Sequence, residues 1–302
     1  MDLGGTKMAV AVADLSGHRL ARTVVPTGAG AGSAEVMARM SDAGHALLAE
    51  TGVGVESVGA AAAVTPGVVL RHGVLLAPNN DGWESLALAQ ELQQAFGTPL
   101  VVVDNDVKAA ARAEARWGRL AGVGTGIYLN LGTGFGCATV VAGEVHRGAH
   151  GAAGEFGYQL TGRSTDRPFA DGGAPLEELA GGRAISERAS ALAGRHLTTA
   201  EAFAHWGADG PIGRLLADAL DVLGRHVANL AVAIDPEVIV VAGGMTGSAE
   251  VILPVLRRYL DQAVPYPPGL ELARLGAEGA LTGAVLMALE AAAEPAPAGR
   301  PG

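Results

Sequence analysis

The chain has 302 residues, of which 49% are apolar and 17% are charged, and its formal net charge is −10. This length suits one large domain or two of ordinary size, with enough apolar residues for a substantial core. The acidic balance, without any basic run, disfavours binding to nucleic acid. The apolar runs are too short to span a bilayer, and the first residues lack the features of a signal peptide. The single cysteine, Cys137, excludes an intramolecular disulfide and a cysteine-rich metal site, so we expect a cytoplasmic protein.

The first half of the chain predicts strands and helices in alternation. Apolar runs between glycine or turn residues predict strands over 8–13, 18–25, 58–63 and 100–103, and a hairpin over 68–76. Apolar residues at helical spacing predict helices over 33–50, 83–96 and 106–117.

The second half is richer in predicted helix. Strands are predicted over 124–130, 137–141 and 238–241, and helices over 176–192, 200–206, 212–234, 249–262 and 280–292. The repetition of similar elements indicates two α/β halves, with a boundary near Asp106. The last residues are rich in proline, alanine and glycine, which is typical of a disordered end.

A glycine-containing turn, Asp2-Leu3-Gly4-Gly5-Thr6-Lys7, lies near the start of the chain. Glycines let the backbone approach an anion, and successive N–H groups form an anion-binding nest. Thr6 and Lys7 add a hydroxyl and a positive charge, and Asp2 can hold a hydrated Mg²⁺ beside a phosphate. The alternative is a hairpin with an ordinary surface lysine, because short glycine motifs are weak signals.

A second glycine turn, Gly132-Thr133-Gly134, lies between two predicted strands. It is not a Walker loop, because no Gly-Lys-Ser/Thr follows, and it is not a dinucleotide fingerprint, because a strand follows instead of a helix. A tight hairpin is the alternative. Two Gly/Thr turns at strand junctions favour two phosphate-binding loops for one nucleotide.

The triplet Asp104-Asn105-Asp106 ends a predicted strand and opens a helix. Active sites of α/β folds gather at the carboxyl ends of strands, so a carboxylate here can serve as a general base for a hydroxyl. Aspartate and asparagine are also favoured helix caps, which is the structural alternative.

Two further segments carry weaker signals. Glu155 lies between glycines and can bind a sugar hydroxyl, although a solvated loop explains it equally simply. Gly243-Gly244 follows a buried strand, where a ligand can approach the backbone or the chain can simply leave the sheet. His146 and His150 resemble metal ligands only superficially, because the glycines around them disfavour an aligning helix.

Taken in order, these motifs resemble the ROK family of sugar kinases, repressors and open reading frames. The resemblance runs from Asp2 to about Ala292. The segments that carry it are Asp2–Lys7, Pro66-Gly67, Ala77–Trp83, Asp104–Asp106, Gly132–Gly134, Gly148–Glu155 and Asp235–Gly244. It implies an actin-like, hexokinase-type fold of two α/β domains with a cleft between them. The expected domains are 1–106 with the helix over 280–292, an ATPase-like unit, and 107–279, followed by a disordered tail over 293–302.

The resemblance also assigns roles to individual residues. It implies that Asp106 is the general base, that Asn79 and Asn105 hold sugar hydroxyls, and that Glu155 and Glu177 bind the far side of the ring. The Gly4–Lys7 and Gly132–Gly134 turns imply phosphate binding, and Gly243-Gly244 implies an adenosine-side segment. ATP and Mg²⁺ are the expected cofactors.

The chain departs from the family pattern at several places, and three of them bear on the site. Tyr158 stands where the family carries a histidine, and we expect it to contact the sugar. The segment over 162–174, where the family has a cysteine-rich zinc loop, has no cysteine or histidine, so no structural zinc is expected. Asn80-Asp81 replaces a more usual apolar-proline pair, and Asp81 can pair with an ammonium group, unless it is only a turn residue.

These observations predict an ATP-dependent kinase for the 6-hydroxyl of a glucose-like hexose or amino-hexose, acting as a homodimer. The alternative substrate is an amino sugar such as kanosamine or glucosamine, as in antibiotic pathways. A sugar-responsive regulator is disfavoured, because no helix-turn-helix domain precedes Asp2. A non-catalytic sugar-binding relic is disfavoured by the retained Asp106 and both glycine turns.

Overall fold

A computed structural model of the chain describes residues 1–28, 30, 32–70, 73–75 and 83–293, and it divides into two compact units. Unit 1 comprises residues 1–113 and 278–302, and unit 2 comprises residues 114–277. The first junction lies inside helix α3 (Asp106–Trp117), the helix at whose first residue the sequence predicted a boundary. Among the helices that the structure describes, none is both long and apolar enough to cross a lipid bilayer.

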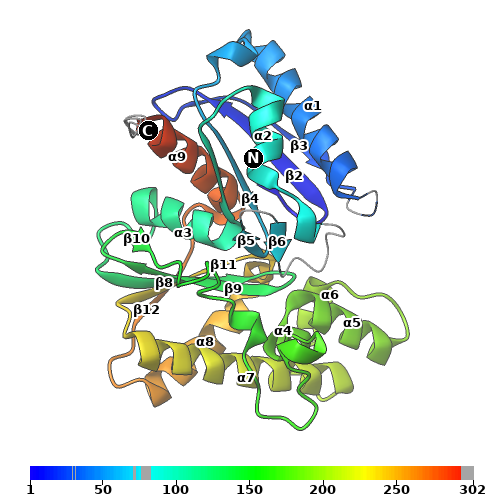
Figure 1. Cartoon of the computed structure of the whole chain (residues 1–302). Helices are drawn as coiled ribbons and strands as arrows, with labels where there is room; N and C mark the ends of the chain where they lie inside the picture. The colour runs from blue at the N-terminus through cyan, green and yellow to red at the C-terminus, as the bar shows by residue number, and fades with distance from the viewer. Residues whose placement is uncertain (29, 31, 71–72, 76–82, 294–302) are drawn as a thin grey trace. The chain divides into compact units, whose positions relative to one another are not determined.

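Unit 1 is built on a five-stranded sheet with the order β3-β2-β1-β4-β7 (Figure 1). Its strands are β1 (Asp2–Leu3), β2 (Lys7–Ala13), β3 (Arg19–Pro26), β4 (Ala61–Thr65) and β7 (Val101–Asn105). Strand β2 is antiparallel to β1 and β3, whereas β1, β4 and β7 run parallel. A separate hairpin consists of β5 (Val68–Leu70) and β6 (Gly73–Leu75). The carboxyl ends of β1, β4 and β7 therefore share one edge.

Helices cover both faces of this sheet (Figure 1). On one face, Ala63 of β4 belongs to a core with Met40 of α1 (Ser33–Thr51) and Leu92 of α2 (Leu88–Phe96). On the other face, Ala62 packs in a cluster with Ala284 of α9 (Gly279–Ala293). Strand β4 is buried along its whole length, which explains why its sequence is a continuous apolar run.

Unit 2 is built on a second five-stranded sheet, with the order β10-β9-β8-β11-β12. Its strands are β8 (Thr125–Leu131), β9 (Phe135–Val141), β10 (Glu144–Val145), β11 (Val238–Ala242) and β12 (Gly269–Leu272). Strands β8, β11 and β12 run parallel, and β9 is antiparallel to β8 and β10. The carboxyl ends of β8 and β11 are neighbours, so the segments that follow them meet.

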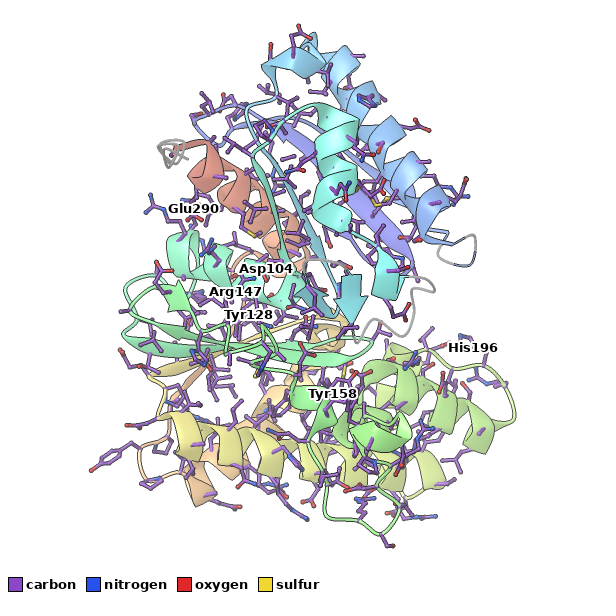
Figure 2. All side chains as sticks on the ribbon, viewed as in Figure 1. Asp104, Tyr128, Arg147, Tyr158, His196 and Glu290 are labelled. Carbon is purple, nitrogen blue, oxygen red and sulfur yellow. The ribbon has the colours of Figure 1, made fainter. Side chains whose placement is uncertain are left out.

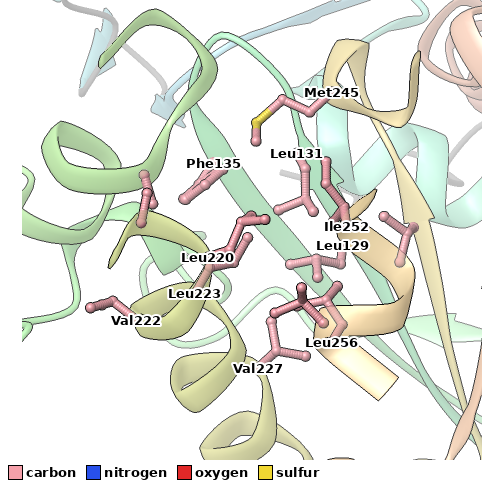
Figure 3. Packing of buried hydrophobic residues seen from close by; sticks show 14 of the residues in the cluster. Leu129, Leu131, Phe135, Leu220, Val222, Leu223, Val227, Met245, Ile252 and Leu256 are labelled. Carbon is pink, nitrogen blue, oxygen red and sulfur yellow. The ribbon is translucent and has the colours of Figure 1, made fainter. Parts of the chain in front are cut away.

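The main core of unit 2 lies between this sheet and its helices (Figure 3). Leu129 of β8 and Leu220 and Leu223 of α7 are fully buried there, with Leu256 of α8. Helix α7 presents apolar residues at intervals of three and four, the pattern of one buried face. The helices of unit 2 are α4 (Pro175–Ala180), α5 (Gly182–Ala193), α6 (Thr199–Phe203), α7 (Pro211–Ile234) and α8 (Ala249–Ala263). Short 3₁₀ turns are η2 (Val55–Ser57), η3 (Trp83–Ser85), η4 (Phe156–Tyr158), η5 (Phe169–Asp171), η6 (Gly244–Ser248) and η7 (Gly276–Glu278).

Two predicted helices differ from the observed ones. The predicted helix over 83–96 begins only at Leu88, after the 3₁₀ turn η3. The predicted helix over 176–192 is wrong as a single element, because it breaks between α4 and α5 at Gly181. Gly181 has extended backbone angles (φ −64°, ψ 153°), and the N–H of Gly182 leaves the helix to bind the carbonyl of Gly132 at 3.0 Å.

Candidate active site

In unit 1, the predicted site segments meet at the shared edge of the sheet. Val64 of β4 lies in register with Asp2 on one side and with Asp104 on the other. The Gly4–Thr6 turn, the Pro66-Gly67 turn and the start of α3 follow these three strands directly. Parallel pairing thus gathers three segments that lie far apart in the sequence.

The Gly4–Thr6 turn is fixed by one buried threonine. The hydroxyl of Thr27 donates to the carbonyl of Gly4 at 2.6 Å, and its N–H donates to the carbonyl of Thr6 at 3.0 Å. A Cβ atom at Gly4 would lie 2.7 Å from the carbonyl oxygen of Lys7, so only glycine fits. The side chains of Thr6 and Lys7 are exposed, so both are accessible to a phosphate.

Asp2 lies at the base of this turn and is half-buried. Burial raises the pKa of this carboxyl, and the charged amino terminus and Lys7 partly offset the effect. A charged carboxylate in such surroundings is stabilised by a cation, and Mg²⁺ is commonly held by one or two carboxylates together with phosphate oxygens. Asp2 therefore fits the role of a magnesium-binding residue beside the turn.

The residues of the Asp104-Asn105-Asp106 triplet, the first of which is labelled in Figure 2, differ in their contacts and burial. The side chain of Asn105 accepts a hydrogen bond from the N–H of Lys108 at 3.1 Å, which caps α3, and donates to the carbonyl of Gly67 at 3.0 Å. Asp104 and Asn105 are buried, whereas Asp106, the first residue of α3, is partly exposed. Oδ1 of Asp106 accepts a hydrogen bond from the N–H of Val107 at 2.9 Å, but because Asn105 caps the helix at Lys108, the helix start does not depend on Asp106 alone.

Two predicted sugar-side residues, Asn79 and Asp81, lie outside the described residues. The flanking Gly67 turn has a φ of 95°, which favours glycine, and Trp83 is fully buried. The roles expected for Asn79 and Asp81 stay predictions.

In unit 2, the Gly132–Gly134 turn is held from two sides. The first N–H groups of α5, from Gly182 and Arg183, donate to the carbonyls of Gly132 and Thr133 at 3.0 and 3.1 Å. With these carbonyls fixed, the N–H groups of Thr133 and Gly134 make no hydrogen bond within the part of the chain that the structure describes. Adjacent N–H groups of this kind form a nest for an anion.

The Gly243-Gly244 pair lies beside the Gly132–Gly134 turn. Gly243 has a φ of 93°, and a Cβ atom there would lie 2.4 Å from the carbonyl oxygen of Leu131. A Cβ atom at Gly132 would lie 3.9 Å from the backbone nitrogen of Gly244. Because β8 and β11 are parallel neighbours, the two glycine segments predicted to bind the nucleotide form one surface.

The residues predicted for the far side of the sugar also gather in unit 2. Gly154 (φ 88°) turns the chain so closely over β9 that a Cβ atom there would lie 1.8 Å from the carbonyl oxygen of Cys137. Tyr158 follows on η4 and is half-buried (Figure 2). Burial raises the pKa of Tyr158, and the carboxylates of Glu155 and Glu177 raise it further. The phenol thus stays protonated at neutral pH and can donate a hydrogen bond.

Glu177 joins this group to the glycine turn. Its Oε2 accepts a hydrogen bond from the N–H of Phe135 at 2.8 Å, and its Oε1 lies 4.0 Å from Nη2 of Arg183. Gly134 and Gly157 both pack against Glu177. A Cβ atom added at Gly134 would lie 2.3 Å from Oε2 of Glu177, and one added at Gly157 would lie 3.1 Å from the Cβ of Glu177. This bracing function could not be read from the sequence, because Glu177 and Phe135 are 42 residues apart.

Comparison with known proteins places this geometry in a family. The model of the ROK family matches residues 1–291, and the chain belongs to the ROK family. The crystal structure of a ROK hexokinase from Thermus thermophilus is 36% identical, with a TM-score of 0.77 over 95% of this chain and 96% of that one. The expected actin-like fold and the expected class of enzyme, a sugar kinase, are therefore confirmed.

Two further relatives differ in their named substrates. A ROK glucokinase from Streptomyces griseus, solved in complex with glucose and AMPPNP, is 26% identical, with a TM-score of 0.76 over 96% of this chain and 98% of that one. An N-acetylmannosamine kinase of Escherichia coli is 30% identical over 96% of this chain and 97% of its own length.

Each unit thus contributes a set of predicted residues. Unit 1 holds Asp2, the Gly4–Lys7 segment, Asn105 and Asp106. Unit 2 holds both Gly132–Gly134 and Gly243-Gly244, together with Glu155, Tyr158 and Glu177. Sequence reasoning missed the residues that fix the turns, namely Thr27 and the Gly182-Arg183 start of α5. The only sequence signal for the latter was the Gly181-Gly182 pair inside a predicted helix.

Proposed function

We propose that this sugar kinase transfers the γ-phosphoryl group of ATP to the 6-hydroxyl of a glucose-like hexose or amino-hexose. The observation that carries the proposal is the position of Glu177. Its carboxylate supports the Gly134–Phe135 backbone and lies near enough to Tyr158 to raise the pKa of the phenol. A phosphate-binding turn and a group of sugar-binding side chains are thus built around one residue.

The proposed reaction needs one proton acceptor and much charge stabilisation. Asp106 takes the proton of the 6-hydroxyl, the hydroxyl oxygen bonds to the γ-phosphorus, and the bond from that phosphorus to the bridging oxygen breaks to release ADP. Asn105, Glu155, Tyr158 and Glu177 hold the other hydroxyls. Positioning and electrostatic stabilisation provide most of the catalysis in phosphoryl transfer.

The phosphate charge is met by backbone N–H groups and by cations. The nest at Thr133 and Gly134 and the Gly4–Lys7 turn bind phosphate oxygens, and Gly243-Gly244 accommodates the adenosine side. Asp2 would hold Mg²⁺, which would supply positive charge to the phosphates. Activity lost in a chelator should therefore return with Mg²⁺ and should not require Zn²⁺.

The test is a coupled ADP-release assay across a panel of hexoses and amino-hexoses with Mg·ATP. Phosphorylation at the 6-position of a hexose or amino-hexose is the expected result, and the position is read from the product by NMR. Absence of turnover with every sugar in the panel, in a folded and monodisperse protein, would contradict the proposal.

An amino-hexose is the second candidate substrate, because a relative of 30% identity is named as an N-acetylmannosamine kinase. Kanosamine, glucosamine and N-acetylmannosamine therefore belong in the same panel as glucose. The specificity constants rank them directly.

A further inference from the structure

The segment over 159–174 connects the sugar-side turn η4 to helix α4 without any strand or α-helix of its own. Irregular loops of this length are uncommon in compact domains and are usually functional. The zinc expected from the family does not fit here, because the segment lacks cysteine and histidine. Among the described residues, no group of three or more potential ligands is placed to hold a metal ion. Another interaction must therefore keep the segment ordered.

The carboxylate of Asp166 lies at the centre of this segment. Its Oδ2 accepts hydrogen bonds from the N–H groups of Thr161 and Gly162 at 2.7 and 2.9 Å, and its Oδ1 accepts from the hydroxyl of Thr161. Partial burial opposes the charged form, but these bonds outweigh it and lower the pKa of Asp166. The side chain is thus an ionised acceptor that ties the start of the segment to its middle.

Two ion pairs attach the segment to helices α7 and α4. Arg163 binds Asp218 of α7 through two bonds of 3.1 and 2.6 Å, and Arg167 binds Glu178 of α4 at 2.7 Å. A bidentate pair fixes orientation as well as distance. Exposed pairs contribute little stability unless they are bidentate, as the Arg163 pair is, so this pair holds the segment together with the three bonds to Asp166.

The segment contacts Tyr158 through Phe169. The ring of Phe169 meets the ring of Tyr158 edge-on, with centroids 5.6 Å apart and an interplanar angle of 82°. Phe169 is 63% exposed, so the surrounding core does not hold it in place. Its position depends on the segment that carries it.

We propose that Asp166 is a positioning residue for the sugar-binding group: it orders segment 159–174 in place of a metal ion and thereby seats Phe169 against Tyr158. This inference rests on the proposed function, because it assigns Tyr158 to the sugar. It predicts that Asp166 affects the sugar and not the nucleotide.

The experiment compares wild type with Asp166→Ala, Asp166→Asn, Phe169→Ala and the Asp166→Ala/Phe169→Ala double variant. Asp261→Ala is the matched control, because it removes an aspartate of α8 that pairs with Arg257 at 3.5 Å, also in unit 2. Steady-state kinetics give KM for sugar and for ATP separately. Hydrogen exchange, read by mass spectrometry, measures protection of segment 159–174 before and after dialysis against a chelator.

We expect Asp166→Ala to raise the sugar KM about ten-fold or more, from the loss of hydrogen bonds to a charged group. The KM for ATP should stay unchanged, and protection of the segment should fall. Asp166→Asn keeps one acceptor oxygen, so its sugar KM and its segment protection should lie between those of wild type and Asp166→Ala. The double variant should be no worse than the stronger single one, because both changes act through the same contact. Chelation should leave wild-type protection unchanged.

Several outcomes overturn the inference: a sugar KM for Asp166→Ala equal to that of Asp261→Ala, additive effects in the double variant, or chelation that removes protection from wild type. Bound zinc at one equivalent, found by elemental analysis, does so as well. If wild type phosphorylates no sugar in the panel, the proposed function fails instead. The exchange data then still decide whether Asp166 orders the segment.

Discussion

The carboxylate of Glu177 and the N–H of Phe135 form a hydrogen bond of 2.8 Å that joins the start of α4 to the turn between β8 and β9. The same carboxylate acts on the phenol of Tyr158. One side chain therefore links the Gly132–Gly134 turn, proposed to bind phosphate, to Tyr158, proposed to contact the sugar, and changes to it should separate the two roles.

Glu177→Gln keeps an oxygen that can accept from Phe135, whereas Glu177→Ala does not. We expect the alanine variant to raise KM for both ATP and sugar about ten-fold, and the glutamine variant to raise KM for sugar alone. Steady-state kinetics with each substrate varied in turn provide the measurement. Equal KM values for ATP in the two variants would show that Glu177 does not brace the turn.

Asp106→Asn should abolish turnover while sugar binding survives. Loss of a positioned general base typically lowers the rate by roughly 10²–10⁴. The helix should stay intact, because Asn105 supplies the cap to Lys108. Single-turnover kinetics and calorimetric sugar binding test both parts, with the melting temperature as the control. Turnover near the wild-type rate would remove Asp106 from the mechanism.

Gly182→Ala should weaken ATP binding and lower stability. An added Cβ atom would lie 2.6 Å from the carbonyl oxygen of Gly132, so the turn must shift. Overpacking typically costs about 1–3 kcal/mol of unfolding free energy. Gly59→Ala is the control, because nothing lies within 4 Å of a Cβ atom there. Denaturant titration and KM for ATP are the readouts. Matching values for the two variants would show that the contact between Gly182 and Gly132 does not hold the turn.

Tyr158→His should make sugar binding depend on pH in the neutral range. The raised pKa of Tyr158 keeps its phenol protonated throughout this range. Histidine titrates near 6.5 in model peptides, and the carboxylates of Glu155 and Glu177 would favour its charged form. As pH falls through that pKa, the ring gains a proton and kcat/KM for sugar should change. The pH profiles of kcat/KM for wild type and Tyr158→Phe should lack this change. If the profiles of all three proteins superimpose, the side chain at position 158 lies away from the sugar.

Asp81→Asn should reduce any preference for an amino-hexose over glucose. A carboxylate beside an ammonium gains a charge-assisted bond, and the loss should change the ratio of specificity constants by about 1–3 kcal/mol. The same variant should affect glucose much less. Kinetics with kanosamine, glucosamine and glucose give the ratio, and an unchanged ratio would assign Asp81 to a turn only.

Local sequence patterns predicted most of the helices and strands and the strand ends at which the candidate site residues lie. Glycine turns, strand ends and apolar spacing are local signals, and Gly132–Gly134 and Asp104–Asp106 lie at strand ends as expected. The contacts that hold these turns are not local. Thr27 reaches Gly4, and Gly182 reaches Gly132, through the fold alone. For the same reason the helix over 176–192 was predicted as continuous: its apolar spacing spans Gly181, and only the distant carbonyl explains the break.

The division of the chain has a consequence for its synthesis. Unit 2 is one continuous stretch, whereas unit 1 needs both its first 113 residues and the helix α9 near the other end. Helix α9 supplies Ala284 and Met287 to one face of the first sheet, against Ala62 and Val64. Chains grow from the amino end, and domains generally fold as units as they emerge. Unit 2 is therefore synthesised in full before unit 1, in whose sheet one apolar face has only Ala109 of α3 from this cluster against it until helix α9 has been made.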